Sequence, residues 1–255
     1  MTPTEIALIV FACMFGGTLA GMFLQTVMPQ HHLNEDSKDV IKLGMGLIGT
    51  ITALVLGLVI ATAKTSYDTL DAAVKHTAAK IVMLDRSLAQ YGPETKETRD
   101  LLRRILANKI DEVWPEERSQ PAGSDTPELL PKVAVEDLEY RLRQLASGND
   151  AQSWLRSRAL QICGEIMETR WLITGSAGSS VPLPFLIVVV FWLTVIFGSF
   201  GLLAPRNATV IMVLFVSALS VACAMFLILE MDQPFKGLMK ISSAPLRFTL
   251  SHLGQ

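Results

Sequence analysis

Long apolar segments flank one long polar segment along the chain. Residues 6–34 and 43–63 contain no Asp, Glu, Lys or Arg, and residues 171–229 contain only Arg206. A helix needs about 20 residues to cross a bilayer core of about 30 Å. The Pro-Arg-Asn break around Arg206 divides the last segment in two. The pattern therefore predicts four membrane spans, at 6–28, 43–63, 184–203 and 208–229.

The polar segment has the periodicity of helices. Apolar residues continue beyond residue 63 at spacings of three, four or their sum, which predicts a helix that leaves the membrane without a break and ends before Gly92. This stripe consists of Tyr67, Leu70, Val74, Ile81, Leu84, Leu88 and Tyr91. Similar patterns predict further helices at 93–114, 131–146 and 151–173. The Pro/Gly/Ser-rich stretch 115–127 is expected to be a loop, and 175–180 a flexible joint.

The expected fold is all-α, with four transmembrane helices and a helical cytoplasmic domain inserted between the second and third spans. The expected boundaries are 1–63 for the first two spans, 64–180 for the inserted domain, 181–230 for the last two spans and 231–255 for a C-terminal tail. The stripe after residue 63 has two interpretations that the sequence leaves open. It packs within the chain as a helical hairpin, or it associates with copies of the same chain.

Composition supports this division and excludes several classes of protein. The 255 residues are 50% hydrophobic and 18% charged, with a net charge of −2, whereas a soluble domain carries about 25% charge. There is no basic excess of the kind that neutralises phosphates, so we predict no nucleic-acid partner. No nucleophile–base pair, phosphate loop, dinucleotide fingerprint or zinc spacing is present, so we predict no enzymatic activity and no resident cofactor. The three cysteines do not predict disulfides.

Small residues recur at every fourth position in both N-terminal spans. They are Gly49, Ala53, Gly57 and Ala61 in the second span, and Ala12, Gly16 and Ala20 in the first. Such stripes let helix backbones approach closely in lipid. One interpretation is that spans one and two pack together through them. The other is that the second span packs around an oligomer axis and lines a pore, where an apolar constriction gates by dewetting.

The pore interpretation names nine residues of the second span and its exit. Those that would line the path are Gly49, Thr50, Ile51, Ala53, Leu54, Gly57, Leu58, Ala61 and Lys64. A ring of Lys64 side chains would attract anions, although a lysine at this position is also typical of an anchor at the membrane surface. The spans contain no Asp, Glu, Lys, Arg or His at mid-membrane. Because proton relays and ion-coupled pumps normally need one, this favours passive permeation or helix packing.

Two carboxylates follow the fourth span, where the helix dipole disfavours anions. One interpretation is structural: Asp232 caps a short helix with Pro234 in its first turn, and Glu230 pairs with Lys236 or with an arginine of the inserted domain. The other is a cation site of unknown metal identity, which would need more oxygen ligands than these two. His31 and His32 in the first loop are expected to be a solvated pair rather than a metal site.

Several segments resemble a bacterial membrane family known as bestrophin-like. They are VPLPFLIVVVFWL from residue 181, the D-x-P-F-x-G segment at 232–237, ISSAPL at 241–246 and GMGLIGTITALVLGLVIATAKTSYD from residue 44. The resemblance implies kinship to bestrophins, which are pentameric anion channels with four spans per subunit and cytoplasmic termini. Bestrophins hold calcium on a long acidic run after the fourth span. Only Glu230 and Asp232 stand there in this chain, so calcium gating is not expected.

The sequence therefore predicts a homo-oligomeric, anion-conducting channel whose second span lines the pore. Two alternatives stay open: a non-conducting scaffold or signalling protein that recruits a cytoplasmic partner, and a stator-like subunit of an ion-driven complex, which shares only the topology. The family and the distribution of Lys and Arg predict a multi-pass protein of the bacterial inner membrane. In this orientation the inserted domain and both termini lie in the cytoplasm.

Overall fold

The computed structural model describes residues 2–29, 34–115, 135–175, 183–235 and 237–254. Over these residues the chain is all-helical, as predicted, and contains no strand. It divides into two compact units, which are described separately. Residues 1–67 and 179–239 form one unit, called here the apolar unit, and residues 68–178 and 240–255 form the other, called the polar unit. The C-terminal tail that we predicted as one segment is thus shared between the two.

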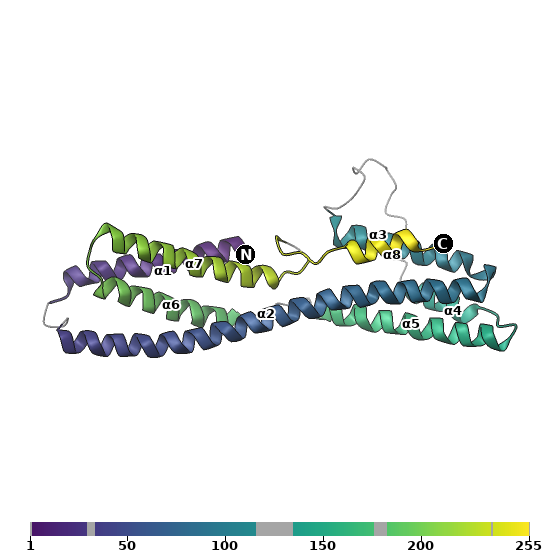
Figure 1. Ribbon diagram of the computed structural model, residues 1–255, viewed down its shortest axis with the longest axis horizontal. Coiled ribbons are helices and arrows are strands. Elements are labelled where there is room, and N and C mark those ends of the chain that lie inside the picture. Colours follow the sequence, from purple (N-terminus) through teal and green to yellow (C-terminus); the bar gives the residue numbers. More distant parts are fainter. Residues whose placement is uncertain (1, 30–33, 116–134, 176–182, 236, 255) are drawn as a thin grey trace. The chain divides into compact units, whose positions relative to one another are not determined.

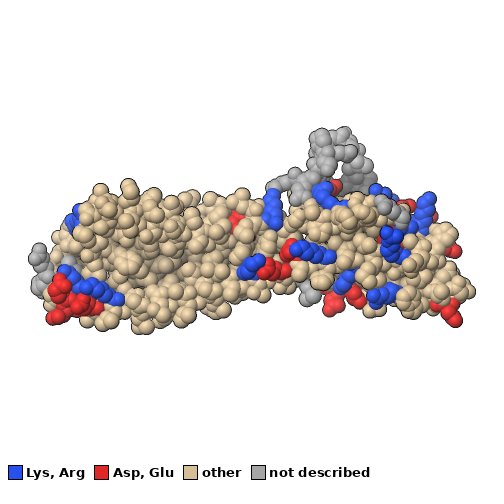
Figure 2. Space-filling view, in the orientation of Figure 1, with Lys and Arg blue, Asp and Glu red and all other residues tan. Residues whose placement is uncertain are grey.

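Among the residues that the structure describes, four helices of the apolar unit are long and apolar enough to cross a membrane. They are α1 (Pro3–Val27), the first part of α2 (Glu35–Tyr91), α6 (Leu183–Leu203) and α7 (Ala208–Met231). Thr2 starts α1 with a capping box to Glu5, and the Asn207 side chain caps the first turn of α7. Figure 2 shows a surface almost without charged side chains over α1, α6 and α7.

The closest helix contact in the apolar unit joins α1 and α6, which lie side by side in Figure 1. A Cβ built on Gly21 would lie 2.0 Å from the carbonyl oxygen of Gly198, and one on Gly201 would lie 2.1 Å from that of Thr18. Only glycine permits this approach, because any side chain would collide with backbone atoms. A sequence spacing of small residues thus marks a helix contact, as expected, but the partner of α1 is α6.

The predicted packing of spans one and two through their small-residue stripes is wrong. Ala12, Gly16 and Ala20 are exposed, and so are Ala53, Gly57 and Ala61. Instead, α2 contributes Val59 and Ala63, from the other side of the helix, to a core formed with α1, α6 and α7. The other buried members of this core are Val10, Met14, Val189, Leu193, Phe197, Ala218, Ala222, Met225 and Ile228.

In its described residues the polar unit contains the second part of α2 together with five shorter elements. These are η2 (Pro93–Thr95), α3 (Lys96–Val113), α4 (Val135–Gln144), α5 (Asp150–Gly175) and α8 (Ala244–His252). From Leu70 to Tyr91 the apolar stripe of α2 is buried within this unit, with Leu84 and Leu88 almost fully enclosed. The structure therefore supports the intrachain interpretation of this stripe, and not its use for self-association. The predicted loop at 115–127 and joint at 175–180 lie almost entirely outside the described residues.

A buried ion pair joins α2 to α3 in the polar unit. Asp85, only 2% exposed, accepts hydrogen bonds from Arg99 Nε at 2.8 Å and Nη2 at 2.9 Å. The hydrogen bond to Asp85 raises the pKa of Arg99 above its already high value. The backbone N–H of Gly254 also approaches Asp85 Oδ2, at 3.4 Å. One carboxylate thus links two helices and the C-terminal end of the chain.

The C-terminal helix α8 was not predicted, and it docks on the polar unit. The indole Nε1 of Trp114 donates to the carbonyl of Ile241 at 2.8 Å, and Thr249 Oγ1 donates to the carbonyl of Ala78 at 3.3 Å. Leu246 and Leu253 are buried beside these contacts, and α8 lies along α3 in Figure 1. The end of the chain is therefore part of the folded helical domain rather than a separate tail.

The close approach of α1 and α6 at Gly21 predicts different effects of an alanine at two glycine positions of α1. Gly21→Ala should destabilise the protein by about 1–3 kcal/mol, because the added methyl group forces α1 away from α6. Gly16→Ala is the matched control, since a Cβ there meets no atom within 4 Å, and it should be neutral or slightly stabilising. Thermal unfolding of the two variants in the same detergent measures the difference. Equal melting temperatures would contradict the close contact.

The buried ion pair makes a second prediction. Arg99→Leu should cost about 3–5 kcal/mol, because it leaves the Asp85 carboxylate buried without its cationic partner. Lys109→Leu breaks the exposed Lys109–Glu112 pair on the same helix and should cost less than about 1 kcal/mol. Hydrogen exchange of the α3 amides reports both variants. If the two variants accelerate exchange equally, the Asp85 pair does not hold α3 in place.

Candidate functional site

The apolar part of α2, which is long enough to cross a membrane, has one packed face and one uncovered face. Val59 and Ala63 are at most 8% exposed and belong to the core of the apolar unit, and Thr52, on the same side of the helix, is 3% exposed. With 3.6 residues per turn, Leu54 and Ala61 lie on the opposite side of the helix. Leu54 is 71% exposed and Ala61 is also exposed. The chain itself therefore covers only one side of this span.

The nine candidate pore residues lie outside the packed face. Thr50, Ala53, Gly57 and Lys64 are exposed, Gly49 is half-buried, and Leu58 is 62% exposed. Thr50, Leu54, Gly57, Ala61 and Lys64 share the side opposite the core. Ile51 and Leu58 flank it on one edge, and Ala53 and Gly49 on the other. The sequence did not distinguish these positions, because the span is apolar on all sides.

Polar groups on the uncovered face of α2 are engaged locally. Thr50 Oγ1 donates to the carbonyl of Gly46 at 2.9 Å, one turn earlier in the helix. The Lys64 ammonium lies 5.7 Å from the centre of the Tyr67 ring, where cation–π attraction holds it at the C-terminal end of the apolar stretch. The hydroxyl of Thr50 still has its acceptor lone pairs. The face is therefore apolar along most of its length, with a positive charge at one end.

The Glu230 carboxylate lies at the end of α7 in a tight backbone cradle. Glu230 is 4% exposed, and its Oε2 accepts a hydrogen bond from the N–H of Leu238 at 2.5 Å. Gly237 has a φ of +84°, and a Cβ there would lie 2.2 Å from Glu230 Oε2. Only glycine adopts this conformation while leaving space for the carboxylate. Glu230 thus fixes the path of the chain where it leaves α7.

Asp232 has a different place from Glu230 at the end of α7. The backbone N–H of Asp232 donates to carbonyls of the last turn, so Asp232 is the C-cap of α7. The prediction that Asp232 caps a following helix is wrong, because the next described helix, α8, begins at Ala244. The predicted partner Lys236 lies outside the described residues. The backbone hydrogen bond of Glu230 is the contact that sequence reasoning missed, although the glycine of the D-x-P-F-x-G segment was the available signal.

Metal and thiol chemistry have little support among the described residues. No group of three or more His, Cys, Asp or Glu side chains comes together in the described part of the chain. His31 and His32 lie outside that part. Cys163 is fully buried in α5, and burial raises the pKa of its thiol to about 11. A thiol with this pKa stays protonated near neutral pH and is a poor nucleophile.

The fold and the uncovered α2 face define the class: a multi-pass membrane protein built from apolar helices and a polar helical unit. The family model described as "Bestrophin-like domain" matches residues 12–246, almost the whole chain. The chain therefore belongs to the bestrophin-like family, as the sequence motifs predicted. Neither curated proteins nor solved structures match the chain in comparisons of sequence and structure.

The Glu230 cradle predicts a local change in backbone protection. Glu230→Gln replaces a charge-assisted hydrogen bond with a neutral one of about half the strength. The Leu238 amide should then exchange roughly tenfold faster. Glu112→Gln is the matched control, because the exposed Glu112 pairs with Lys109 on α3, and it should leave Leu238 protection unchanged. Hydrogen exchange with fragment-level mass spectrometry measures both. Unchanged protection in Glu230→Gln would show that the carboxylate does not hold the loop.

Proposed function

We propose that the protein is a homo-oligomeric ion channel, selective for anions, in which α2 of each copy lines a central path. The observation that carries the proposal is the uncovered face of α2. Within its apolar stretch only 6% of residues are buried inside the chain, compared with 22–28% for α1, α6 and α7. A membrane span that is packed on one side and continuous on the other suits a position between its own bundle and an axis shared with other copies.

The leucine side chains of this face would form an apolar gate. Leu54 and Leu58 lie about one turn apart and project from the uncovered side. Rings of such side chains around an axis form an apolar constriction, which excludes water and ions when narrow and conducts when it widens or wets. Gly57 and Ala61 lie on the same side and permit neighbouring backbones to approach. The proposed gate thus needs no titratable group at mid-membrane.

Selectivity in this proposal comes from charge at the end of the path. Lys64 follows the apolar stretch, and a ring of Lys64 ammonium groups would concentrate anions at the mouth. Membership of the bestrophin-like family supports an anion channel rather than a transporter or an enzyme. We further propose that the four apolar helices all cross the bacterial inner membrane. Both termini and the polar unit would then lie in the cytoplasm, in line with the positive-inside rule.

Purified full-length protein in planar bilayers tests the proposal. Wild type should conduct, with a reversal potential in a KCl gradient that lies close to the chloride equilibrium potential. Leu54→Thr should raise the open fraction several-fold, because a hydroxyl keeps the constriction wet. Met212→Thr is the matched control. Met212 is 68% exposed on α7, so the same polar change should leave conduction unaltered.

Absence of current in wild type and in Leu54→Thr, with both proteins folded and inserted, would overturn the channel proposal. It would favour a scaffold that recruits a cytoplasmic partner. Equal activation by Leu54→Thr and Met212→Thr would instead show that added polarity, and not the α2 face, controls the current.

A further inference from the structure

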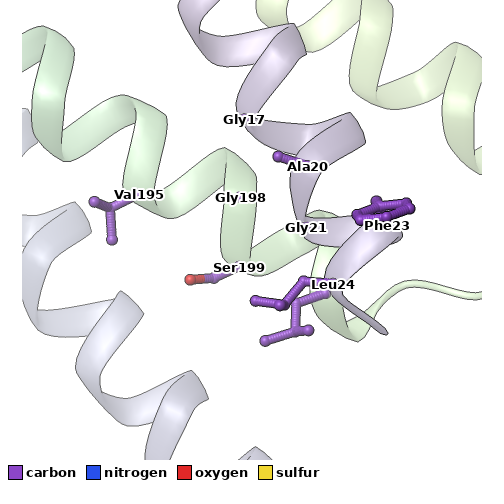
Figure 3. A pocket seen from close by; sticks show the side chains of 9 residues that line it. Gly17, Ala20, Gly21, Phe23, Leu24, Val195, Gly198 and Ser199 are labelled. Carbon is purple, nitrogen blue, oxygen red and sulfur yellow. The ribbon is translucent and has the colours of Figure 1, made fainter. Parts of the chain in front are cut away.

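The turn that follows α7 exposes apolar side chains at the end of a helix long enough to cross a membrane. This exit turn runs from Asp232 to Met239, and residue 236 in it lies outside the described part of the chain. Leu238 is 80% exposed and Met239 is 36% exposed. The exit turn differs from the shallow groove of about 410 Å³ beside the glycine backbones of α1 and α6, which Figure 3 shows. None of the residues that line this groove is charged, whereas a buried charge holds the exit turn.

The buried carboxylate of Glu230 fixes the level of Leu238 relative to α7. Glu230 is 4% exposed and accepts a hydrogen bond from the backbone N–H of Leu238 at 2.5 Å. It is the first charged residue after the apolar run of α7, so it marks the level at which this run ends. The hydrogen bond holds the backbone of Leu238 within one side-chain length of that level. Leu238 is therefore fixed where a membrane-crossing helix would meet the lipid headgroups.

The exit turn is attached at the end of an exposed apolar stripe on α7. The members of this stripe recur at spacings of three and four and are all exposed: Val216, Leu219, Cys223 and Leu227. Glu230 follows Leu227 by three residues and leaves α7 on the same side. Ala218 and Met225, which belong to the core of the apolar unit, lie on the opposite side of the helix. The stripe thus points away from the core, and the exit turn is held at its end.

We propose that the exit turn is an interfacial anchor, in which Leu238 and Met239 insert among the lipids of the bilayer that α7 crosses. Apolar side chains at a membrane surface lie about 5–10 Å into the boundary between headgroups and acyl chains. The inference rests on the proposed crossing of the membrane by α7, and not on conduction. Lipid is favoured over a second copy of the chain by the proposed ring. In that ring the uncovered face of α2 is turned to the axis, and the stripe of α7 points away from the core that the two helices share.

The cradle around Glu230 gives the anchor a fixed geometry. Gly237 has a φ of +84°, and a side chain there would collide with the Glu230 carboxylate. Glycine and a buried charge together hold a backbone segment whose next side chain, Leu238, is exposed on the single chain. A lipid surface takes this side chain out of water and so supplies the favourable transfer that the chain itself does not provide.

Spin labels on the full-length protein in phosphatidylcholine vesicles test the depth of the exit turn. With the native cysteines replaced by alanine, Leu238→Cys, Val216→Cys and Ser153→Cys each carry one label. Power saturation compares collisions with oxygen, which partitions into lipid, and with a water-soluble nickel complex. At position 238 oxygen should dominate, at a depth of about 5–10 Å below the headgroup boundary. Ser153, exposed on α5 in the polar unit, is the control, and there the nickel complex should dominate.

The label at position 216 separates failure of the anchor from failure of the proposed membrane crossing. A lipid-exposed label at 216 with a water-exposed label at 238 overturns the anchor and leaves the channel proposal standing. Water-exposed labels at both positions overturn the crossing, and the anchor with it. Gly237→Ala should move the label at 238 toward water, because it opens the cradle. An unchanged depth in this variant would overturn the role of Glu230 in holding the anchor.

A photo-crosslinking residue at position 238 identifies what covers the exit turn while the cradle stays intact, and it decides if Gly237→Ala does not fold. Adducts with phosphatidylcholine support the proposal. Adducts with a second copy, or with the polar unit of the same chain, overturn it. The same residue at position 153 should give no lipid adducts, and equal lipid labelling at 153 and 238 would also overturn the anchor.

Discussion

The apolar unit depends on the approach of two helix backbones, α1 and α6, through glycine. In lipid, burial of apolar surface does little to drive helices together, because lipid tails are as apolar as the side chains. Close packing and dispersion must supply the attraction, and both increase when Gly21 meets Gly198 without side chains between them. The contact brings α1 and α6 together, α7 packs beside α1, and the core residues of α2 close the cluster from one side.

This arrangement accounts for the uncovered face of α2. Val59 and Ala63 pack in the core, and Thr52 is buried on the same side of the helix. The opposite side of the helix is exposed on the single chain. A lipid-facing span has no need of small residues, whereas Gly57 and Ala61 suit contact with another helix. The same helix continues into the polar unit, where Leu84 and Leu88 bury a different stripe and Asp85 pairs with α3. One helix thus belongs to both units, and at the end of α7 Glu230 fixes the turn at Gly237 and Leu238 within the apolar unit.

Hydropathy alone predicted the apolar helices, because the length of an uncharged run is a local property of the sequence. The helix ends were also predictable within a few residues from Asn207, Gly92 and Pro93. Helix pairing was not, since Gly17 and Gly21 stand beside Ala12, Gly16 and Ala20, and nothing local selects one set for packing. The docking of α8 was missed for a related reason: Trp114 and Ile241, whose hydrogen bond holds it, are 127 residues apart. The Glu230–Leu238 hydrogen bond was missed likewise, because it forms only when the chain turns at Gly237 and comes back to the end of α7.

The proposed channel requires that the face of α2 carrying Leu54 and Ala61 surrounds an axis shared by several copies. Electron cryomicroscopy of the full-length protein in lipid nanodiscs, with a map viewed along the symmetry axis, measures this. We expect a closed ring of copies with a continuous axial path and with Thr50, Leu54, Gly57 and Ala61 facing it. A monomer, or an assembly in which this face of α2 lies against lipid away from the axis, would overturn the proposed channel.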